Sequence, residues 1–240
     1  MKFSITKDSS SKIGRLEAFT DGVFAIAITL LILDIHVPHV TEGQKLLSFL
    51  FADWPTYLAF LIGFFTILIC WINHNYMFEF INRCDGGLLL CNGFKLLIVS
   101  FTPFATAILS KYIGTSQQQT AVNIYTLNFF LMGTAMSFIW YYAVRNGLTK
   151  TNDPALLKAV SRLYIFAPII SGTIFILSFF SISISFILFV IMFLVYVIPQ
   201  NSARELQKKH GFRYFRFNRQ PQLSIAEENK IASVKLDIDE

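Results

Sequence analysis

The chain has 240 residues, of which 54% carry hydrophobic side chains and only 15% are charged, with a formal net charge of +5. This composition is too apolar for an ordinary soluble domain and indicates an integral membrane protein. The 12 Gly and 7 Pro are too few for a collagen-like or disordered chain. The 3 cysteines, Cys70, Cys84 and Cys91, match neither a disulfide framework nor a zinc motif, so we interpret them as free thiols.

Six stretches reach the roughly 20 apolar residues that a helix needs to cross a bilayer. The last apolar region is too long for one span, and we divide it near Ser181–Ser185 into two helices joined by a tight turn. The six predicted spans are Phe19–Val37, Trp54–Ile81, Gly87–Leu109, Ala121–Val144 and the two halves of Leu163–Ile198. The sequence therefore predicts an all-α, polytopic membrane protein with six transmembrane helices.

The basic residues predict which ends of these spans face the cytoplasm. All but Lys45, Lys95 and Lys111 of the 20 Lys and Arg residues lie before the first span, between spans two and three, between spans four and five, or after span six. Because cytoplasmic loops are enriched in Lys and Arg, both termini are predicted to be cytoplasmic. The charged start precedes a full-length span without a small-residue cleavage site, so we do not interpret it as a secretory signal.

Three regions follow from these spans. Residues 1–14 are predicted to be a cytoplasmic N-terminus, residues 15–200 the transmembrane domain, and residues 201–240 a cytoplasmic tail. The first half of the tail, Asn201–Gln220, interleaves basic with aromatic residues. This pattern is typical of a juxtamembrane segment that binds anionic lipid headgroups, which we favour over nucleic-acid binding. The acidic remainder is predicted to be disordered.

Polar residues inside the spans need an explanation, because a charged side chain there costs at least a few kcal/mol. Asp21 and Lys95 lie at similar depth and could form an ion pair, while His74, Asn92 and Glu79 lie toward the same ends of their spans. A polar cluster that ties three helices together accounts for all of them. One histidine does not make a metal site, and no nucleophile, metalloprotease or phosphate-loop motif is present, so we predict that the protein is not an enzyme.

The first span has two distinct sides. At about 100° per residue, Ile26, Leu30 and Leu33 form one aliphatic stripe with Thr29 beside it, and Asp21 falls on the other side of the helix. Periodicity alone does not decide whether the stripe faces lipid, the protein core or a pore.

The same region resembles a known family. Arg15-x-x-x-Phe19-Thr20-Asp21, followed by a long aliphatic helix, is similar to the Arg-x-x-x-Phe-Ser-Asp signature of the transmembrane protein 175 (TMEM175) potassium channels. The segment Trp71-Ile72-Asn73-His74 is similar to part of the family's second helix. The resemblance extends over about residues 12–110.

Three positions depart from the family pattern. Thr20 replaces the serine of the signature but keeps a hydroxyl group, and Asn75 stands where many relatives have a second histidine. Lys95 is a charge that the resemblance does not lead us to expect in the third helix. None of these departures removes a residue that the resemblance places in the pore.

The resemblance implies a homotetramer in the cell membrane of a prokaryote, with the four first helices around one central pore. Potassium would be the permeant ion, and no cofactor is implied. Ile26 matches the hydrophobic constriction, Leu30 and Leu33 the aliphatic residues farther out, and Thr29 a threonine layer linked to potassium preference. The expected signature and bracing residues are Arg15, Phe19, Thr20, Asp21, His74 and Asn92. Asp34 would lie at the outer mouth.

The resulting hypothesis is a potassium-selective leak-type cation channel. Since the chain lacks the Thr-Val-Gly-Tyr-Gly filter, selectivity would have to arise in the narrow aliphatic stretch. The alternative is a proton- or ion-coupled secondary transporter that uses Asp21, His74 and Lys95. It lacks the broken helices or inverted repeat that such transporters usually show. A non-conducting membrane scaffold would explain the composition but not the signature.

Overall fold

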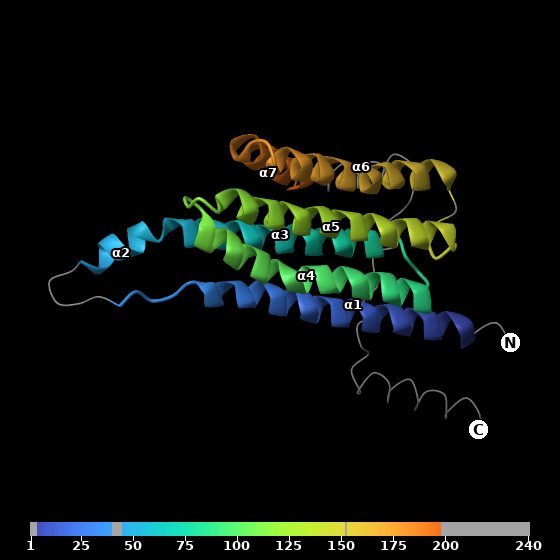
Figure 1. Cartoon of the computed structure of the whole chain (residues 1–240). Coiled ribbons are helices and arrows are strands. Elements are labelled where there is room, and N and C mark those ends of the chain that lie inside the picture. Colours follow the sequence, from blue (N-terminus) through green and yellow to red (C-terminus); the bar gives the residue numbers. More distant parts are fainter. Residues whose placement is uncertain (1–3, 40–44, 152, 198–240) are drawn as a thin grey trace, which may run out of the picture. The chain divides into compact units, whose positions relative to one another are not determined.

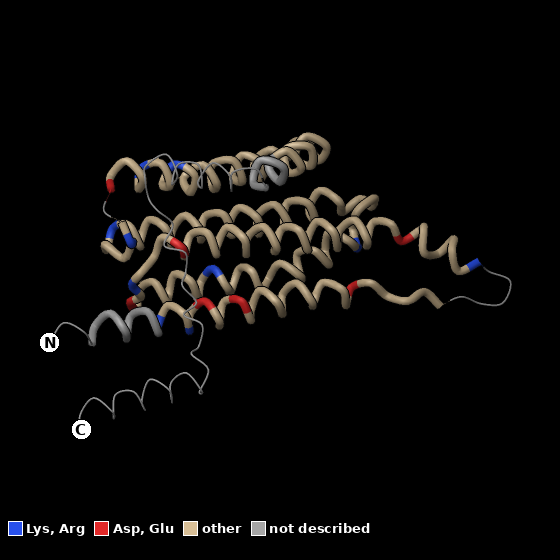
Figure 2. The backbone as a smooth tube through the Cα atoms, turned by 180° about the vertical axis from the view of Figure 1, so that it is seen from behind, with Lys and Arg blue, Asp and Glu red and all other residues tan. Residues whose placement is uncertain are grey.

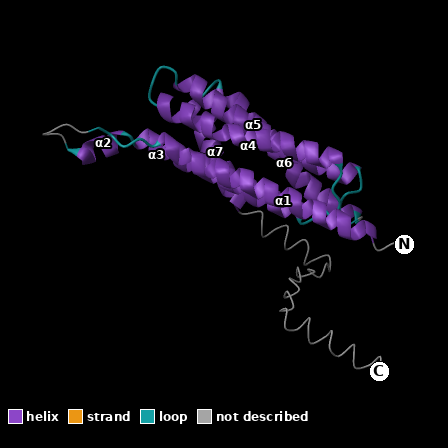
Figure 3. Ribbon diagram, turned by 90° about the horizontal axis from the view of Figure 1, so that it is seen from below, coloured by secondary structure: helices purple, strands orange, loops and turns teal. Residues whose placement is uncertain are grey.

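The computed structural model describes residues 4–39, 45–151 and 153–197, with side chains described for residues 12–39, 45–151 and 153–191. This part of the chain is almost entirely helical, which confirms the predicted all-α class (Figures 1 and 3). The helices are α1 (Ser4–Leu30), the 3-10 helix η1 (Leu31–Asp34), α2 (Leu46–Ala52), α3 (Trp54–Phe78), α4 (Gly86–Tyr112), α5 (Gln118–Arg145), α6 (Pro154–Ser178) and α7 (Ile182–Val197). The tail at 201–240 and the lipid-binding role predicted for it lie outside the described residues.

Within the described residues, five helices are long and apolar enough to cross a membrane: α1 with η1 from Lys12 onward, α3, α4, α5 and α6. Helix α7 has 16 residues in the described part of the chain. It follows a short turn after α6, close to the division that we predicted near Ser181–Ser185. The described helices have the length and apolar character of a multi-pass membrane protein.

Several helix boundaries differ from the predicted spans. Helix α1 begins at Ser4 rather than Phe19, because charged residues that do not fit a bilayer core can still be helical. Helix α6 begins at Pro154 rather than Leu163, and the Asp153 carboxylate caps it by accepting a hydrogen bond from the Ala155 N–H at 2.9 Å. Glu79 lies just beyond α3 and is exposed.

The helices pack in an order that places α1 at one side of the bundle. Helix α1 lies against α4 and α3, α4 packs along α5, and α5 packs along α6 (Figure 1). Small residues and side-chain hydrogen bonds hold these contacts, as is common in membranes. For example, Asn128 Nδ2 of α5 donates to Thr102 Oγ1 of α4 at 2.9 Å, and the hydroxyls of Thr66 and Tyr125 are 2.8 Å apart.

Two loops are joined at the end of the bundle where α3 meets α4. The α3–α4 loop and the α5–α6 loop, which we call the paired connections, share an antiparallel bridge between Ile81 and Thr149. The Lys150 N–H donates to the Phe80 carbonyl at 2.8 Å, and the Asn82 N–H donates to the Leu148 carbonyl at 2.9 Å. These bonds fix the two helix pairs to each other at this end.

The start of α4 strengthens the paired connections. Asp85 Oδ1 accepts a hydrogen bond from the Leu88 N–H at 2.8 Å, and Asp85 Oδ2 accepts one from the Tyr142 hydroxyl at 3.0 Å. Burial, followed by the neighbouring Asp85 carboxylate, raises the pKa of the Cys84 thiol. Cys84 is therefore protonated at neutral pH, in agreement with the interpretation of the cysteines as free thiols.

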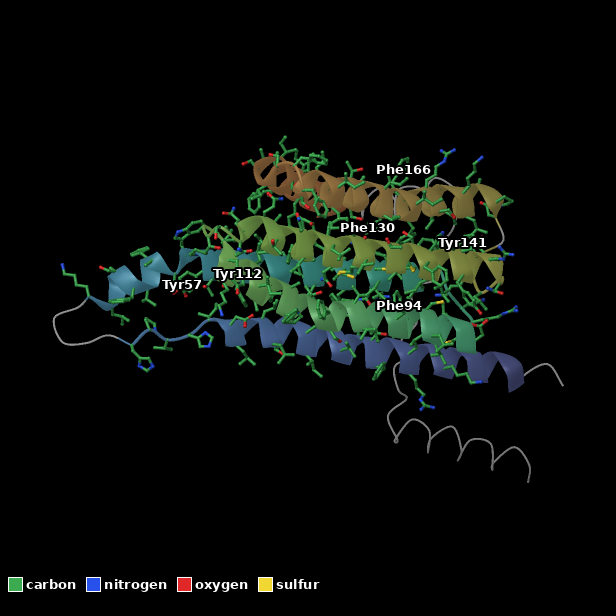
Figure 4. All side chains as sticks on the ribbon, viewed as in Figure 1. Tyr57, Phe94, Tyr112, Phe130, Tyr141 and Phe166 are labelled. Atoms are coloured by element: carbon green, nitrogen blue, oxygen red, sulfur yellow. The ribbon has the colours of Figure 1, made fainter. Side chains whose placement is uncertain are left out.

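Charged and aromatic residues are distributed as expected for helices that cross a bilayer. Much of the length of the helices is free of charge, and many charged residues lie near helix ends and loops (Figure 2). Tyr57 and Tyr112 lie toward one end of the bundle and Tyr141 toward the other (Figure 4). Tyrosine is enriched at both membrane–water interfaces, so these positions agree with a bundle that spans the membrane.

Candidate functional site

Helix α1 and its extension η1 bury one side in the bundle. The residues on this side recur every three or four positions, which places them along one face of a helix. They are Ile13, Leu16, Thr20, Phe24, Ala27 and Leu31. In the described conformation, packing of this side decides which residues of α1 point away from the subunit.

The predicted pore residues all lie on the opposite, exposed side. Ile26 is 61% exposed, Leu33 66% and Leu30 44%, and Thr29 is also exposed. The Thr29 hydroxyl donates to carbonyls of its own helix, to Ala25 at 2.9 Å and Ile26 at 3.0 Å. Its oxygen keeps acceptor capacity toward the outside. A single subunit thus presents a long apolar face with one hydroxyl group, which we call the α1 face (Ile26, Thr29, Leu30 and Leu33).

Behind the α1 face, two hydrogen bonds tie the helix to its neighbours. Asn92 Nδ2 of α4 donates to Thr20 Oγ1 at 2.8 Å, and both residues are fully buried. Trp71 Nε1 of α3 donates to Asp21 Oδ1 at 2.8 Å, at the exposed edge of the same region. Consecutive residues of α1 therefore bind two different helices.

Two ionisable side chains are fully buried next to these bonds. The His74 ring lies near the rings of Phe24 and Phe78, with centroid distances of 6.1 and 4.2 Å. Lys95 Nζ lies 4.6 Å from the centroid of the Phe24 ring, within the range of a cation–π interaction. We call Thr20, Asp21, Trp71, His74, Asn92 and Lys95 the rear cluster.

The ion pair that we considered between Asp21 and Lys95 is not formed in this structure. Asp21 is bound by the indole N–H of Trp71 instead. Within the described chain, Lys95 Nζ, both ring nitrogens of His74 and Asn92 Oδ1 have no hydrogen-bond partner. Buried polar atoms without partners are rare and often mark functional positions.

The structure thus brings together four of the six predicted signature and bracing residues: Thr20, Asp21, His74 and Asn92. The other two, Arg15 and Phe19, lie on exposed positions of α1, and Phe19 is 65% exposed. Trp71 and Phe24 were not among the residues predicted for the site. The sequence did hold one indication for Trp71: it lies in a neighbouring span, at a depth similar to that of Asp21.

The end of η1 carries the residue predicted at the outer mouth. Asp34 is half-buried, and its carbonyl oxygen lies 2.9 Å from His36 Nδ1. Together with the α1 face, it extends the line of predicted pathway residues to the end of the helix.

Replacing Thr20 with valine is expected to lower the free energy of unfolding by about 1–2 kcal/mol, because the buried Asn92 amide would lose its acceptor. Thr20→Ser, which keeps the hydroxyl, is expected to stay close to the wild type. Thermal unfolding of the detergent-solubilised protein measures the effect. The control is Thr134→Val on α5, an exposed threonine whose hydroxyl binds only its own helix at the Phe130 carbonyl. Equal losses for the two valine variants would contradict the proposed tie between α1 and α4.

The chain is similar to a family model and to several known proteins. A family model described as endosomal/lysosomal potassium channel TMEM175 matches residues 15–103. A protein of Chamaesiphon minutus named as a potassium channel is 39% identical over 179 residues, which are 73% of this chain and 88% of the relative. A protein of Streptomyces collinus with the same designation is 41% identical over 135 residues, 56% of this chain and 66% of the relative.

A solved structure is also similar. The crystal structure of a lysosomal potassium-selective channel TMEM175 homolog from Chamaesiphon minutus superposes with a TM-score of 0.72 at 36% identity, over 80% of this chain and 99% of that chain. A longer relative from Gallus gallus, named as an endosomal/lysosomal proton channel, is 33% identical over 139 residues, which are 54% of this chain and 28% of the relative.

Proposed function

The chain belongs to the TMEM175 family, and from this premise we propose that it is a potassium-selective leak-type cation channel. The observation that carries the proposal is the α1 face: four predicted pathway residues, Ile26, Thr29, Leu30 and Leu33, are exposed along one side of a helix whose other side is anchored in the bundle. The relatives are named as channels and not as enzymes, and potassium, the permeant ion, needs no cofactor.

We propose that four subunits assemble with their α1 faces around one central pore. A continuous apolar face that remains exposed in a single subunit needs a second surface or lipid to cover it. Fourfold assembly would turn that face into the lining of a pathway. The orientation proposed for the subunit has both termini in the cytoplasm of a prokaryotic cell, because most basic residues lie at that end. The basic-aromatic segment 201–220 would bind anionic lipid there.

The mechanism follows from the chemistry of the α1 face. Four Ile26 side chains would form a constriction without ion ligands, so that a cation must lose part of its hydration shell to pass. Potassium loses water at a lower free-energy cost than sodium, which favours potassium. A hydrophobic ring can also close by dewetting, so a small rotation of α1 is enough to gate the pore. Thr29 would supply a hydroxyl layer beside the constriction, and Asp34 would attract cations to the mouth.

The continuity of the helices at the site argues against the transporter alternative. Transporters usually bind their substrates where a membrane helix is interrupted. Helices α1, α3 and α4 are continuous over the whole region of the rear cluster. A static bracing role for this cluster, behind a permanent pathway, fits the arrangement better than a moving substrate site.

The deciding experiment is the reversal potential of the purified protein in a planar bilayer, with potassium on one side and sodium on the other. We expect a potential displaced toward that of potassium. A second recording with a pH gradient and symmetrical potassium measures proton permeation, since vertebrate relatives are named as proton channels. Saturable, proton-coupled flux in place of ion current linear in driving force would overturn the channel in favour of the transporter.

A further inference from the structure

The rear cluster contains a buried lysine, Lys95, whose ammonium group has no hydrogen-bond partner within the described chain. Lys95 has no exposed surface. Its Nζ lies 4.6 Å from the centroid of the Phe24 ring. A fully buried ammonium without a carboxylate partner is costly, so a second conformation that supplies a carboxylate would compete with this one.

The Asp21 carboxylate is the candidate partner for the Lys95 ammonium. Asp21 precedes Phe24 by three positions on α1, and residues with this spacing are neighbours on the helix surface. The Asp21 carboxylate is within electrostatic range of the Lys95 ammonium, which itself contacts the Phe24 ring. Cys70, a thiol, and His74 also lie within electrostatic range of Lys95 on the α3 side. Neither of them is a carboxylate.

In the described conformation the hydrogen bond of the Asp21 carboxylate goes to Trp71 and not to Lys95. Trp71 Nε1 donates to Asp21 Oδ1 at 2.8 Å, and Trp71 belongs to α3, whereas Lys95 belongs to α4. The carboxylate thus binds a donor on one helix and is within electrostatic range of a second donor on another helix. Binding one donor draws α1 toward α3, and binding the other draws it toward α4.

We propose that Trp71 and Lys95 compete for Asp21, and that this exchange moves α1 between two conformations of the pore. The inference rests on the proposed channel function and adds the element that gates it. Asp21 lies on the side of α1 away from the α1 face, so a shift of its partner turns Ile26 relative to the pore axis. The neutral tie between Thr20 and Asn92, one position earlier on α1, persists as the pivot of this movement.

The test uses single-channel recordings of the full chain in a planar bilayer. Trp71→Phe removes the donor of the described conformation, and Lys95→Met removes the donor of the other one with little change in side-chain length. We expect the two variants to change the ratio of open to closed time in opposite directions, each by at least threefold. The double variant destabilises both conformations and is expected to return toward the wild type.

The matched control is Lys111→Met, at the end of the same helix α4, where the ammonium lies 6.0 Å from the Tyr112 ring and the side chain is exposed. It is expected to leave the ratio unchanged. If the wild type conducts but both single variants change the ratio of open to closed time in the same direction, or neither changes it, the proposed exchange is wrong and the proposed channel function still stands. Absence of any wild-type current would instead overturn the proposed function on which the exchange rests.

A measurement without current tests the donor exchange directly. If the ammonium is unpaired in the prevailing conformation, Lys95→Met is expected to leave the melting temperature of the purified protein unchanged or raised, because it removes an uncompensated buried charge. Trp71→Phe is expected to lower it. A marked fall for Lys95→Met would mean that the ammonium is already well bound, and it would overturn the competition.

Discussion

Replacing Ile26 with asparagine is expected to raise the unitary potassium conductance several-fold and to bring the potassium-to-sodium permeability ratio toward one. The physical reason is that the amide binds water and cations where the isoleucine side chain offers no ligand. The constriction would then stay wetted, and an ion could keep more of its hydration shell as it passes. Conductance and reversal potential under bi-ionic conditions measure both effects in the same recording.

The matched control for this substitution is Ile176→Asn on α6. Both isoleucines are 61% exposed in the subunit, but Ile176 belongs to a helix that the proposed assembly does not place at the pore. The control is expected to leave conductance and selectivity unchanged. If Ile26→Asn also leaves both unchanged, Ile26 does not lie in the pathway, and the proposed direction of the α1 face is wrong.

The second large effect concerns the packing of α1 and η1 against the bundle. A Cβ atom at Gly63 of α3 would lie 2.6 Å from Thr106 Oγ1 of α4 and 3.1 Å from Leu31 Cδ2 of η1. These distances leave no room for a side chain, and both neighbours are buried. Gly63→Leu is therefore expected to lower the free energy of unfolding by about 3 kcal/mol or more, with a smaller loss for Gly63→Ala.

Thermal unfolding and the yield of folded protein after purification measure this loss. Gly93→Leu on α4 is the control, because a Cβ atom at Gly93 would meet nothing within 4 Å in the subunit. We expect the wild type and Gly93→Leu to be the most stable, Gly63→Ala to be less stable, and Gly63→Leu to be the least stable. A Gly63→Leu variant as stable as the control would show that α3 and α4 do not approach as closely as described.

Much of this architecture is predictable from the sequence, because hydropathy and helical period are local properties. The stripe formed by Ile26, Leu30 and Leu33 is visible from their spacing alone, and the structure places these residues on one exposed side. The same helical period predicts that Asp21 lies on a different side of the helix from this stripe. The turn between α6 and α7 was also predictable, since one apolar stretch was too long for a single span.

The partner of Asp21 was not predictable in this way. Trp71 and Lys95 occur at similar depth in neighbouring spans, and both are donors. Which one the carboxylate meets depends on how α3 and α4 rotate about their axes, and that rotation is set by packing across the whole bundle. Hydropathy likewise could not locate the start of α1 at Ser4, because it measures fit to the bilayer and not helicity. Helix α2, with 7 residues, is too short to produce a periodic signal.

Helix α1 runs without a proline from Ser4 to Leu30, and its 27 residues correspond to about 40 Å. Near the middle of α1, Glu17 is within electrostatic range of Lys150 in the paired connections. A stiff rod of this kind transmits torque from one end to the other with little bending. If the α1 face lines the pore as proposed, a lipid or protein that twists the first turns of α1 at the membrane surface would turn Ile26 in the same sense.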